Sequence, residues 1–176
     1  FLTPEEGQSL MDEAKGQMKG FIVTGLNTGL RKGELFALKW EDVNFDRRES
    51  RVTKSKGKRL RVIPMNDLLT KTLKSHPRHI TSSYVFHNRE GSRWRDVRGS
   101  FNSALKRAGL PRIRIHDMRH SFVSNLFMAG VDLRAVQELA GHRGIKTTMR
   151  YAHLMPGHLK NSVERLRWTT GPPDNR

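Results

Sequence analysis

The sequence predicts a mostly α-helical domain of the α+β class that contains one small antiparallel β-sheet. Apolar residues recur every three or four positions over most of the 176 residues, as they do in amphipathic helices. Between Val43 and Met65 the period changes to two, and lysine and glycine form a turn region in the middle of this stretch. That pattern indicates short antiparallel strands joined by a hairpin.

The first predicted helix begins with a capping box. Thr3 is a suitable N-cap, Pro4 suits the first helical position, and Glu6 stands three residues after the cap. This helix should run to about Lys15. A second helix is predicted from the apolar spacing in MKGFIVTGLNTGL, and Gly29 should end it.

A third helix is predicted over roughly residues 31–39. Its apolar residues Leu35 and Leu38 should face inward. Arg31 and Glu34 then lie one turn apart on another face, where opposite charges can pair.

The sheet is followed by a short helix after Asp67 and by a segment, YVF at 84–86, that is expected to add an edge strand. A clean helical stripe begins at Val97 and ends at Gly109. This stripe is expected to supply core rather than site residues.

The C-terminal third predicts three more helices and an apolar stripe. One helix should end at Gly130, and Asp132 should cap the next, which ends at Gly141. A short helix capped by Thr147 is expected to carry Tyr151.

The last apolar stripe has two interpretations, which the sequence leaves about equal. Leu159, Val163 and Leu166 share one helical face that either packs on its own core or docks on a neighbouring subunit. Residues 1–168 are expected to form one domain, with 169–176 a disordered tail.

Composition favours a globular protein that binds a polyanion. Residues are 35% hydrophobic and 28% charged, and lysine plus arginine outnumber aspartate plus glutamate 33 to 17, a net charge of +16. Such a field attracts nucleic acid. The chain has no cysteine, which excludes disulfides and thiolate metal sites. No apolar run approaches the ~20 residues of a membrane span, and no signal-peptide pattern opens the sequence, so a cytoplasmic, DNA-associated protein without membrane contact is expected.

The segment HDMRH raises a metal-site alternative. His116 and His120 have the i, i+4 spacing of zinc hydrolases, but Asp117 stands where those enzymes need glutamate. Arg119 would also lie beside the divalent cation, which is electrostatically unfavourable. We therefore favour a phosphate site.

A phosphodiester under attack needs fixed cations and a nucleophile. Arg31 and Arg119 can present planar guanidinium forks to its oxygens, and histidines add donors or a proton acceptor. Of the two tyrosines, Tyr84 lies in an apolar strand-like run, whereas Tyr151 lies among polar and basic residues. Tyr151 is thus the better nucleophile, and a lysine of the hairpin can protonate the leaving oxygen.

Five segments carry a resemblance to a known family. TGLRKGEL, KGKRLRVIP, HDMRH, LAGH and TMRYAH resemble, in order and spacing, the motifs of the tyrosine recombinase (phage integrase) family, catalytic domain. The resemblance implies the following catalytic set: Arg31, a hairpin lysine, His116, Arg119, His142 and Tyr151.

The resemblance also implies a mechanism and partners. Family enzymes attack double-stranded DNA with the tyrosine, form a 3′-phosphotyrosyl link and a free 5′ hydroxyl, and need no metal or other cofactor. They exchange strands as a tetrameric synapse, sometimes with accessory DNA-bending proteins, to integrate or excise mobile elements. Because the chain starts at Phe1, an upstream DNA-clamping domain is expected outside it.

The hairpin lysine is assigned between two candidates. Counting back from Pro64 without gaps places Lys56 on the catalytic position, and we favour it, although TKSK also fits a version with a longer turn in which Lys54 serves. Arg61 is expected to contact DNA phosphates or to solvate the hairpin, as are Lys58 and Arg59.

Neighbouring polar residues are expected to support the site. Glu34 should hold Arg31 by hydrogen bonding, Asp117 suits a helix start, and His120 is expected to support its neighbours rather than act directly. No role is assigned to His153.

Two other functions compete with recombination. A type IB topoisomerase uses similar residues, but the LAGH segment nine residues before Tyr151 favours the recombinase. A silent DNA-binding module would have no physical reason to keep every reactive residue.

Overall fold

The structure is a computed structural model that describes residues 1–53 and 60–155. Its α-helices within these ranges are α1 (Pro4–Glu13), α2 (Gly16–Thr28), α3 (Lys32–Ala37), α4 (Asp67–Lys74), α5 (Arg98–Arg107), α6 (Asp117–Met128), α7 (Leu133–Ala140) and α8 (Ile145–Met149). Two short 3₁₀ helices, η1 (Trp40–Asp42) and η2 (Ala152–Leu154), precede the sheet and follow α8. The predicted mostly helical class is confirmed.

The predicted sheet is present as three antiparallel strands in the order β1-β2-β3. They are β1 (Val43–Asn44), β2 (Glu49–Thr53) and β3 (Leu60–Pro64). Ser50 pairs with Val43 on one side and with Ile63 on the other, which fixes the register. Leu60 and Val62 are exposed while Arg61 and Ile63 are buried, so β3 alternates between solvent and the interior.

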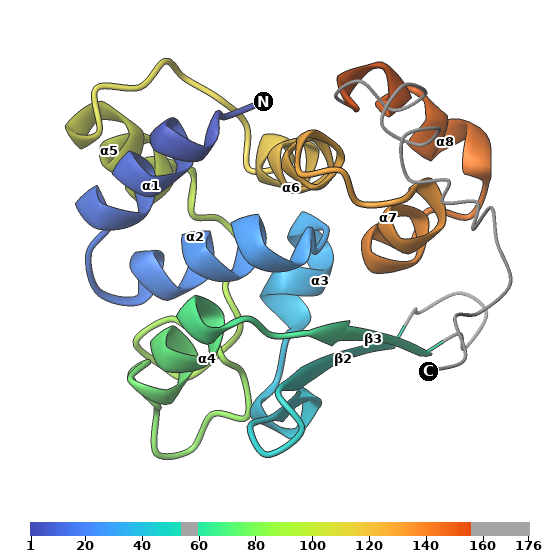
Figure 1. Cartoon of the computed structure of the whole chain (residues 1–176). Coiled ribbons are helices and arrows are strands. Elements are labelled where there is room, and N and C mark those ends of the chain that lie inside the picture. Colours follow the sequence, from blue (N-terminus) through green and yellow to red (C-terminus); the bar gives the residue numbers. More distant parts are fainter. Residues whose placement is uncertain (54–59, 156–176) are drawn as a thin grey trace, which may run out of the picture.

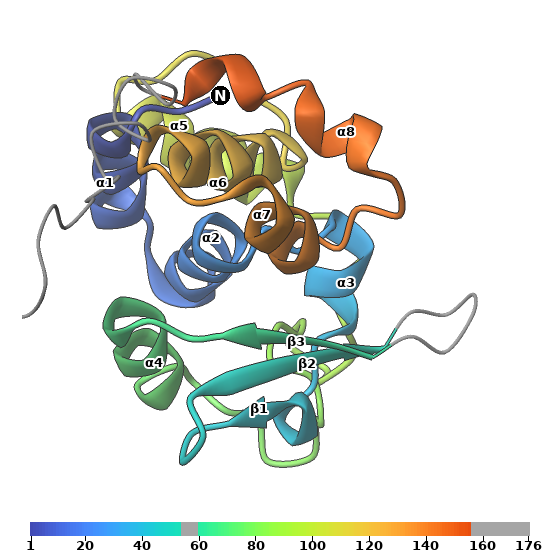
Figure 2. The same ribbon diagram turned by 45° about the vertical axis from the view of Figure 1, so that its right-hand side comes forward.

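Helix α2 is the centre of the molecule and contacts α1, α4 and α6. Figure 2 shows the sheet and α4 on one side of α2 and helices α5 and α6 on the other, with α7 between α6 and β3. The core that α2 organises is apolar and includes Phe21, Ile22, Phe86 and Phe101, each buried. Helices α6, α7 and α8 follow one another from the centre to the right of Figure 1. Arg31 at the start of α3 contacts Gly141 at the end of α7, so the C-terminal motifs lie close to the start of α3.

Local capping chemistry places several helix ends where the sequence predicts them. Thr3 and Glu6 form the reciprocal capping box of α1, with hydrogen bonds of 3.2 and 2.8 Å. The Asp132 side chain accepts the backbone N–H groups of Arg134 and Ala135 at the start of α7. Gly141 ends α7 in the left-handed conformation, at φ 65°.

The predicted edge strand at 84–86 is wrong. Tyr84 forms only an isolated bridge with Lys39, and Val85 and Phe86 are fully buried in the core. The Val85 N–H donates to the Leu38 carbonyl at 2.9 Å. The segment is thus an extended core loop, because its apolar side chains pack in the core, where Phe86 contacts Phe21 of α2, instead of lying on a sheet edge.

The short helix before the tyrosine also differs from the prediction. Helix α8 begins at Ile145 with Gly144 as its N-cap, so Thr147 lies inside it. Tyr151 follows the end of α8 and precedes η2 instead of lying on the helix. Likewise, α3 ends at Ala37, two residues before the predicted limit.

No helix among the described residues is both long and apolar enough to cross a membrane. The predicted stripe at 159–166 and the predicted tail lie outside the described residues.

Candidate active site

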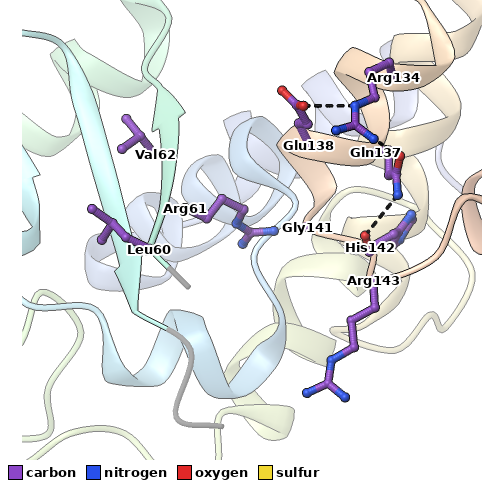
Figure 3. Close-up of a pocket in the computed structure, with 9 residues that line it drawn as sticks. All are labelled: Leu60, Arg61, Val62, Arg134, Gln137, Glu138, Gly141, His142 and Arg143. Atoms are coloured by element: carbon purple, nitrogen blue, oxygen red, sulfur yellow. Dashed lines mark hydrogen bonds and ion pairs between the residues drawn. The ribbon is translucent and has the colours of Figure 1, made fainter. Parts of the chain in front are cut away.

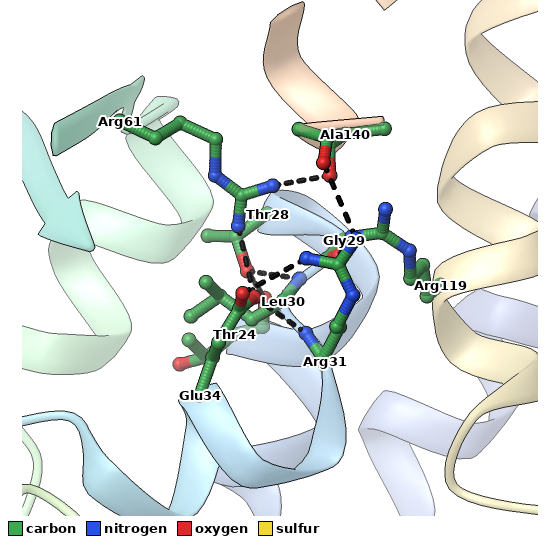
Figure 4. Close-up of polar contacts among 10 residues, drawn as sticks. Thr24, Thr28, Gly29, Leu30, Arg31, Glu34, Arg61, Arg119 and Ala140 are labelled. Atoms are coloured by element: carbon green, nitrogen blue, oxygen red, sulfur yellow. Dashed lines mark hydrogen bonds and ion pairs between the residues drawn. The ribbon is translucent and has the colours of Figure 1, made fainter. Parts of the chain in front are cut away.

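Three arginines from different parts of the chain lie close together, and one carboxylate pairs with two of them (Figure 4). Arg31 is the N-cap residue of α3, Arg61 lies in β3, and Arg119 lies in the first turn of α6. Glu34, one turn into α3, stands between Arg31 and Arg61.

Glu34 binds both of these arginines. Its Oε1 accepts from Arg31 Nη1 at 3.0 Å and its Oε2 from Arg61 Nη2 at 3.0 Å, while Oε2 also accepts the Arg31 backbone N–H at 2.9 Å. Burial would raise the pKa of Glu34, but the Arg31 backbone N–H and the charges of Arg61 and Arg31 outweigh it and lower that pKa. The carboxylate is therefore ionised at neutral pH.

The C-terminal end of α7 is held by the same arginines. Arg31 Nη2 donates to the Gly141 carbonyl at 3.2 Å, and Arg61 Nη1 donates to the Ala140 carbonyl. Free carbonyls at a helix C-terminus carry partial negative charge, so they favour cations. These bonds tie the LAGH segment to α3 and β3.

Arg119 is the most deeply buried of the three arginines, with 4% of its surface exposed. Its Nη1 donates to the Gly29 carbonyl at 2.6 Å, but its buried Nη2 has no partner among the described residues. Burial and the charges of Arg31 and Arg61 lower the pKa of Arg119 to about 10, which leaves it charged at neutral pH. Glu34 thus pairs with two of the three neighbouring guanidinium groups, and within the described residues the cluster keeps an excess of positive charge.

His142 follows Gly141 directly and lies at the edge of this cluster. Its Nδ1 is 2.9 Å from the Thr148 hydroxyl, a group that is fully buried in α8. Burial and the charges of Arg119 and Arg31 lower the pKa of His142 to about 4, so its ring is neutral at neutral pH. A neutral ring can donate a hydrogen bond from the nitrogen that Thr148 leaves free.

A polar pocket of about 320 Å³ opens next to His142 between β3 and α7 (Figure 3). Its lining includes Arg61 of β3 and Gly141 at the end of α7. Arg134 of α7 and Arg143 of the turn after α7 also line it. Its walls therefore carry mostly positive charge.

Tyr151 packs against α6. Its hydroxyl is hydrogen-bonded to Nδ1 of His120, and its ring lies nearly parallel to that of Phe127, with centroids 6.5 Å apart. Burial raises the pKa of Tyr151, although the charges of Arg150 and Arg119 act to lower it. The phenol is accordingly protonated at neutral pH and needs an acceptor for its proton before it can attack.

His116 is the N-cap residue of α6 and lies beside His120. The two rings meet edge to face, with centroids 4.9 Å apart. Burial and the charge of Arg119 lower the pKa of His116, which favours its neutral form. Within residues 1–53 and 60–155 no group of three or more metal-binding side chains comes together.

The sequence of this chain matches a known protein family. The model of the phage integrase family matches residues 1–158. The chain belongs to the phage integrase family. The resemblance drawn from the five sequence motifs is thus confirmed.

Two relatives illustrate the sequence similarity. The integrase of Salmonella phage P22 is 30% identical, over 94% of this chain and 46% of that protein. Tyrosine recombinase XerA of Pyrococcus furiosus is 34% identical, over 93% of this chain and 60% of that protein. The integrase-family chain therefore spans only about half the length of the curated relatives that it matches.

Solved structures agree with the fold. The catalytic domain of bacteriophage HP1 integrase has a TM-score of 0.73 at 28% identity, with 94% of each chain covered. The Tn1549 transposon integrase, solved in complex with circular intermediate DNA, has a TM-score of 0.76 at 27% identity, over 94% of this chain and 66% of that one.

The integrase-family structure brings together most of the predicted site residues. Arg31 and Arg119 belong to the arginine cluster, and His142 lies next to it. His116 and Tyr151 both contact His120, the residue that follows Arg119. The hairpin lysines, Lys56 and its alternative Lys54, lie outside the described residues, as do Lys58 and Arg59.

Arg61 is a correction to the sequence analysis. It was expected to contact DNA or solvent, yet only 8% of it is exposed and it binds Glu34 and Ala140. The sequence signal that indicates its burial is the alternation of inward and outward residues along β3. Residue 61 shares the buried face of Ile63, while Leu60 and Val62 face outward.

Proposed function

We propose that this integrase-family chain is the catalytic part of a tyrosine recombinase, which cleaves and rejoins DNA strands through a 3′-phosphotyrosyl intermediate. The recombination it serves is integration or excision of a mobile element. Arg31, the hairpin lysine Lys56, His116, Arg119, His142 and Tyr151 are the proposed catalytic residues.

The strongest support for the proposal is the charge of the arginine cluster. Its three arginines carry more positive charge than the carboxylate of Glu34 neutralises. Glu34 pairs with Arg31 and Arg61, while buried Arg119 keeps an N–H group without a partner. Buried cations without a counter-ion are unfavourable unless a ligand supplies one. A phosphodiester supplies the negative charge and oxygens that guanidinium groups bind in pairs.

Double-stranded DNA is the partner that presents phosphodiesters as part of a polyanion. The net charge of +16 favours a polyanion over a small phosphate ester. The DNA complex of the Tn1549 integrase, a structural relative, supports the same partner. We expect the full protein to act on DNA as a tetramer, with accessory DNA-bending proteins where its sites require them.

The proposed cleavage is a transesterification at one phosphorus of the DNA backbone. The Tyr151 oxygen attacks the phosphorus, its proton passes to the neutral ring of His116, and the bond from phosphorus to the 5′ oxygen breaks. Lys56 gives a proton to the leaving 5′ oxygen, and Arg31 and Arg119 bind the non-bridging oxygens as their charge grows. His116 and His142, neutral at neutral pH, donate or accept hydrogen bonds at the same phosphate. Attack by a 5′ hydroxyl on the phosphotyrosine reverses the step and rejoins a strand.

Covalent capture tests this function. The chain is incubated with a pool of nicked duplexes that carry a randomised target region, and adducts are separated on denaturing gels and sequenced. We expect an adduct enriched in one sequence that Tyr151→Phe abolishes, while binding to the pool is unchanged. Binding without any adduct would contradict the proposal and favour a silent DNA-binding module.

A further inference from the structure

We propose that His120 is a positioning residue that holds the phenol of Tyr151 in the orientation from which it attacks. The inference rests on the proposed function, since it concerns the nucleophile of that reaction. It goes beyond the proposed catalytic set, in which His120 has no role.

The backbone of Tyr151 is fixed to the turn that carries His142. The Tyr151 N–H donates to the Thr148 carbonyl at 3.1 Å, and the hydroxyl of the same threonine contacts His142. Tyr151 then begins the 3₁₀ turn η2, which contacts α6. This anchoring leaves the side-chain torsions as the main freedom of the nucleophile.

Two residues of α6 restrict that freedom. His120 and Phe127 are seven positions apart, which is close to two helical turns, so they share one face of α6. The Tyr151 ring is inclined by 7° to the Phe127 ring and by 34° to the His120 ring, with centroids 6.5 and 6.0 Å away. The phenol therefore lies along α6 and points toward its first turns.

His120 holds the reactive atom itself. Its Nδ1 is the one hydrogen-bond partner of the Tyr151 hydroxyl in the described part of the chain. Burial and the proximity of His116 lower the pKa of His120, which favours a neutral ring whose free Nδ1 accepts the phenol O–H. The edge-to-face contact with His116 keeps the His120 ring from turning away.

The position of His120 on α6 places the hydroxyl beside the arginine cluster. With about 100° per residue, Arg119 lies about 60° to one side of His116 and His120 about 40° to the other. His116 thus stands between the arginine that binds Gly29 and the histidine that binds Tyr151. A phosphate bound by the arginine cluster would therefore lie on one side of His116, and the Tyr151 hydroxyl would lie on the other.

Matched substitutions separate positioning from a general loss of structure. Asparagine places its side-chain oxygen near the position of histidine Nδ1, whereas glutamine places its polar end near Nε2. In the covalent capture assay we expect His120→Asn to retain cleavage within about threefold, and His120→Gln and His120→Ala to lose about tenfold or more. Equal thermal midpoints would show that all three variants fold alike.

A second readout needs neither DNA nor activity. The Tyr84→Phe variant leaves Tyr151 as the only tyrosine, so ¹³Cζ-tyrosine labelling gives one NMR resonance that reports its hydroxyl. We expect His120→Ala to move this resonance and His120→Asn to return it toward the parent value.

Several results would overturn the positioning role of His120. Cleavage by His120→Ala at the parent rate, or loss in folded His120→Asn equal to that in His120→Ala, would overturn the inference. So would a Tyr151 resonance that His120→Ala leaves unchanged. If the parent chain forms no DNA adduct at all while the resonance responds as expected, the proposed function fails and the His120–Tyr151 contact stands.

Discussion

Glu34 Oε2 lies 3.0 Å from Arg61 Nη2, and this ion pair joins the start of α3 to strand β3. Both side chains are largely buried, at 16% and 8% exposure, so the pair is shielded from solvent. Because Glu34 also binds Arg31, its carboxylate holds two of the three clustered arginines in place.

Replacing Glu34 by glutamine should therefore destabilise the fold. Glutamine keeps the shape but removes the negative charge that pairs with Arg31 and Arg61, and breaking a buried ion pair from one side costs about 3–5 kcal/mol. Urea unfolding should show a loss of about 2–4 kcal/mol, since the amide oxygen retains one hydrogen bond. The control is Glu138→Gln, whose pair with Arg134 is exposed and should matter by less than about 1 kcal/mol.

Gly141→Ala should disturb the site more than an equivalent change elsewhere. Gly141 has a left-handed φ of 65°, and a Cβ there would collide with the Arg61 guanidinium. Gly130 has φ 77° but open space around its missing Cβ, so Gly130→Ala reports the backbone strain alone, about 1 kcal/mol. We expect a larger loss in Gly141→Ala, together with reduced DNA cleavage. Equal stabilities of the two variants would contradict the collision.

Thr148→Val should weaken cleavage by releasing the His142 ring. Valine has nearly the shape of threonine but cannot bond Nδ1 of His142, now 2.9 Å from the hydroxyl. Loss of such a bond is worth about 1–1.5 kcal/mol, or about tenfold in the rate of adduct formation. Thr148→Ser keeps the hydroxyl and should restore most of the rate, and an inactive serine variant would argue against this role.

Stability should fall as the pH drops from about 6.5 to about 4, in part through His76. Burial lowers the pKa of this histidine to about 4, and the charge of nearby His87 adds to the effect. Between these pH values the unfolded chain binds a proton that the folded chain excludes, which favours unfolding by up to about 3 kcal/mol.

His76→Gln tests this assignment. Glutamine does not titrate and can still donate to the Val85 carbonyl, which His76 Nε2 now contacts at 3.1 Å. Urea midpoints at pH 7 and pH 4.5 should therefore differ less in the variant than in the parent chain. Part of the acid loss should remain, because His142 has a similarly low pKa. An unchanged difference would exclude His76 as its source.

Lys56→Ala should lose strand cleavage by about 100-fold or more if Lys56 protonates the leaving 5′ oxygen. Lys54→Ala should retain it. A substrate with sulfur in place of that oxygen has a leaving group that needs no proton, and it should rescue Lys56→Ala. The reverse pattern would assign the role to Lys54.

Elements defined by local chemistry could be predicted from the sequence, and those defined by packing could not. The capping box of Thr3 and Glu6 and the cap at Asp132 act within one helical turn, so both are readable from the chain. The apolar segment containing Val85 and Phe86 has the composition of a strand, but its place in the core depends on helices far away in the sequence.

The site shows the same division. Motif spacing predicted that Arg31, Arg119 and Tyr151 belong to one site, because the resemblance to a known family implies their order. It assigned Arg61 to the surface, although the alternation along β3 places this residue on the buried face with Ile63; its partner Glu34 lies in another element, which that alternation does not specify. The contact between His120 and Tyr151 joins α6 to the turn after α8, and no local pattern encodes it.

The convergence of Arg31, Arg61 and Arg119 has a consequence for molecules that are not fully folded. A nascent or heat-damaged chain still carries its whole excess of basic residues, which attracts nucleic acid without any folded structure. The proposed phosphate site is different, because its three guanidinium groups meet only when α3, β3 and α6 have docked. General attraction to a polyanion and the assembly of the proposed site are therefore separate properties, and only the second depends on folding.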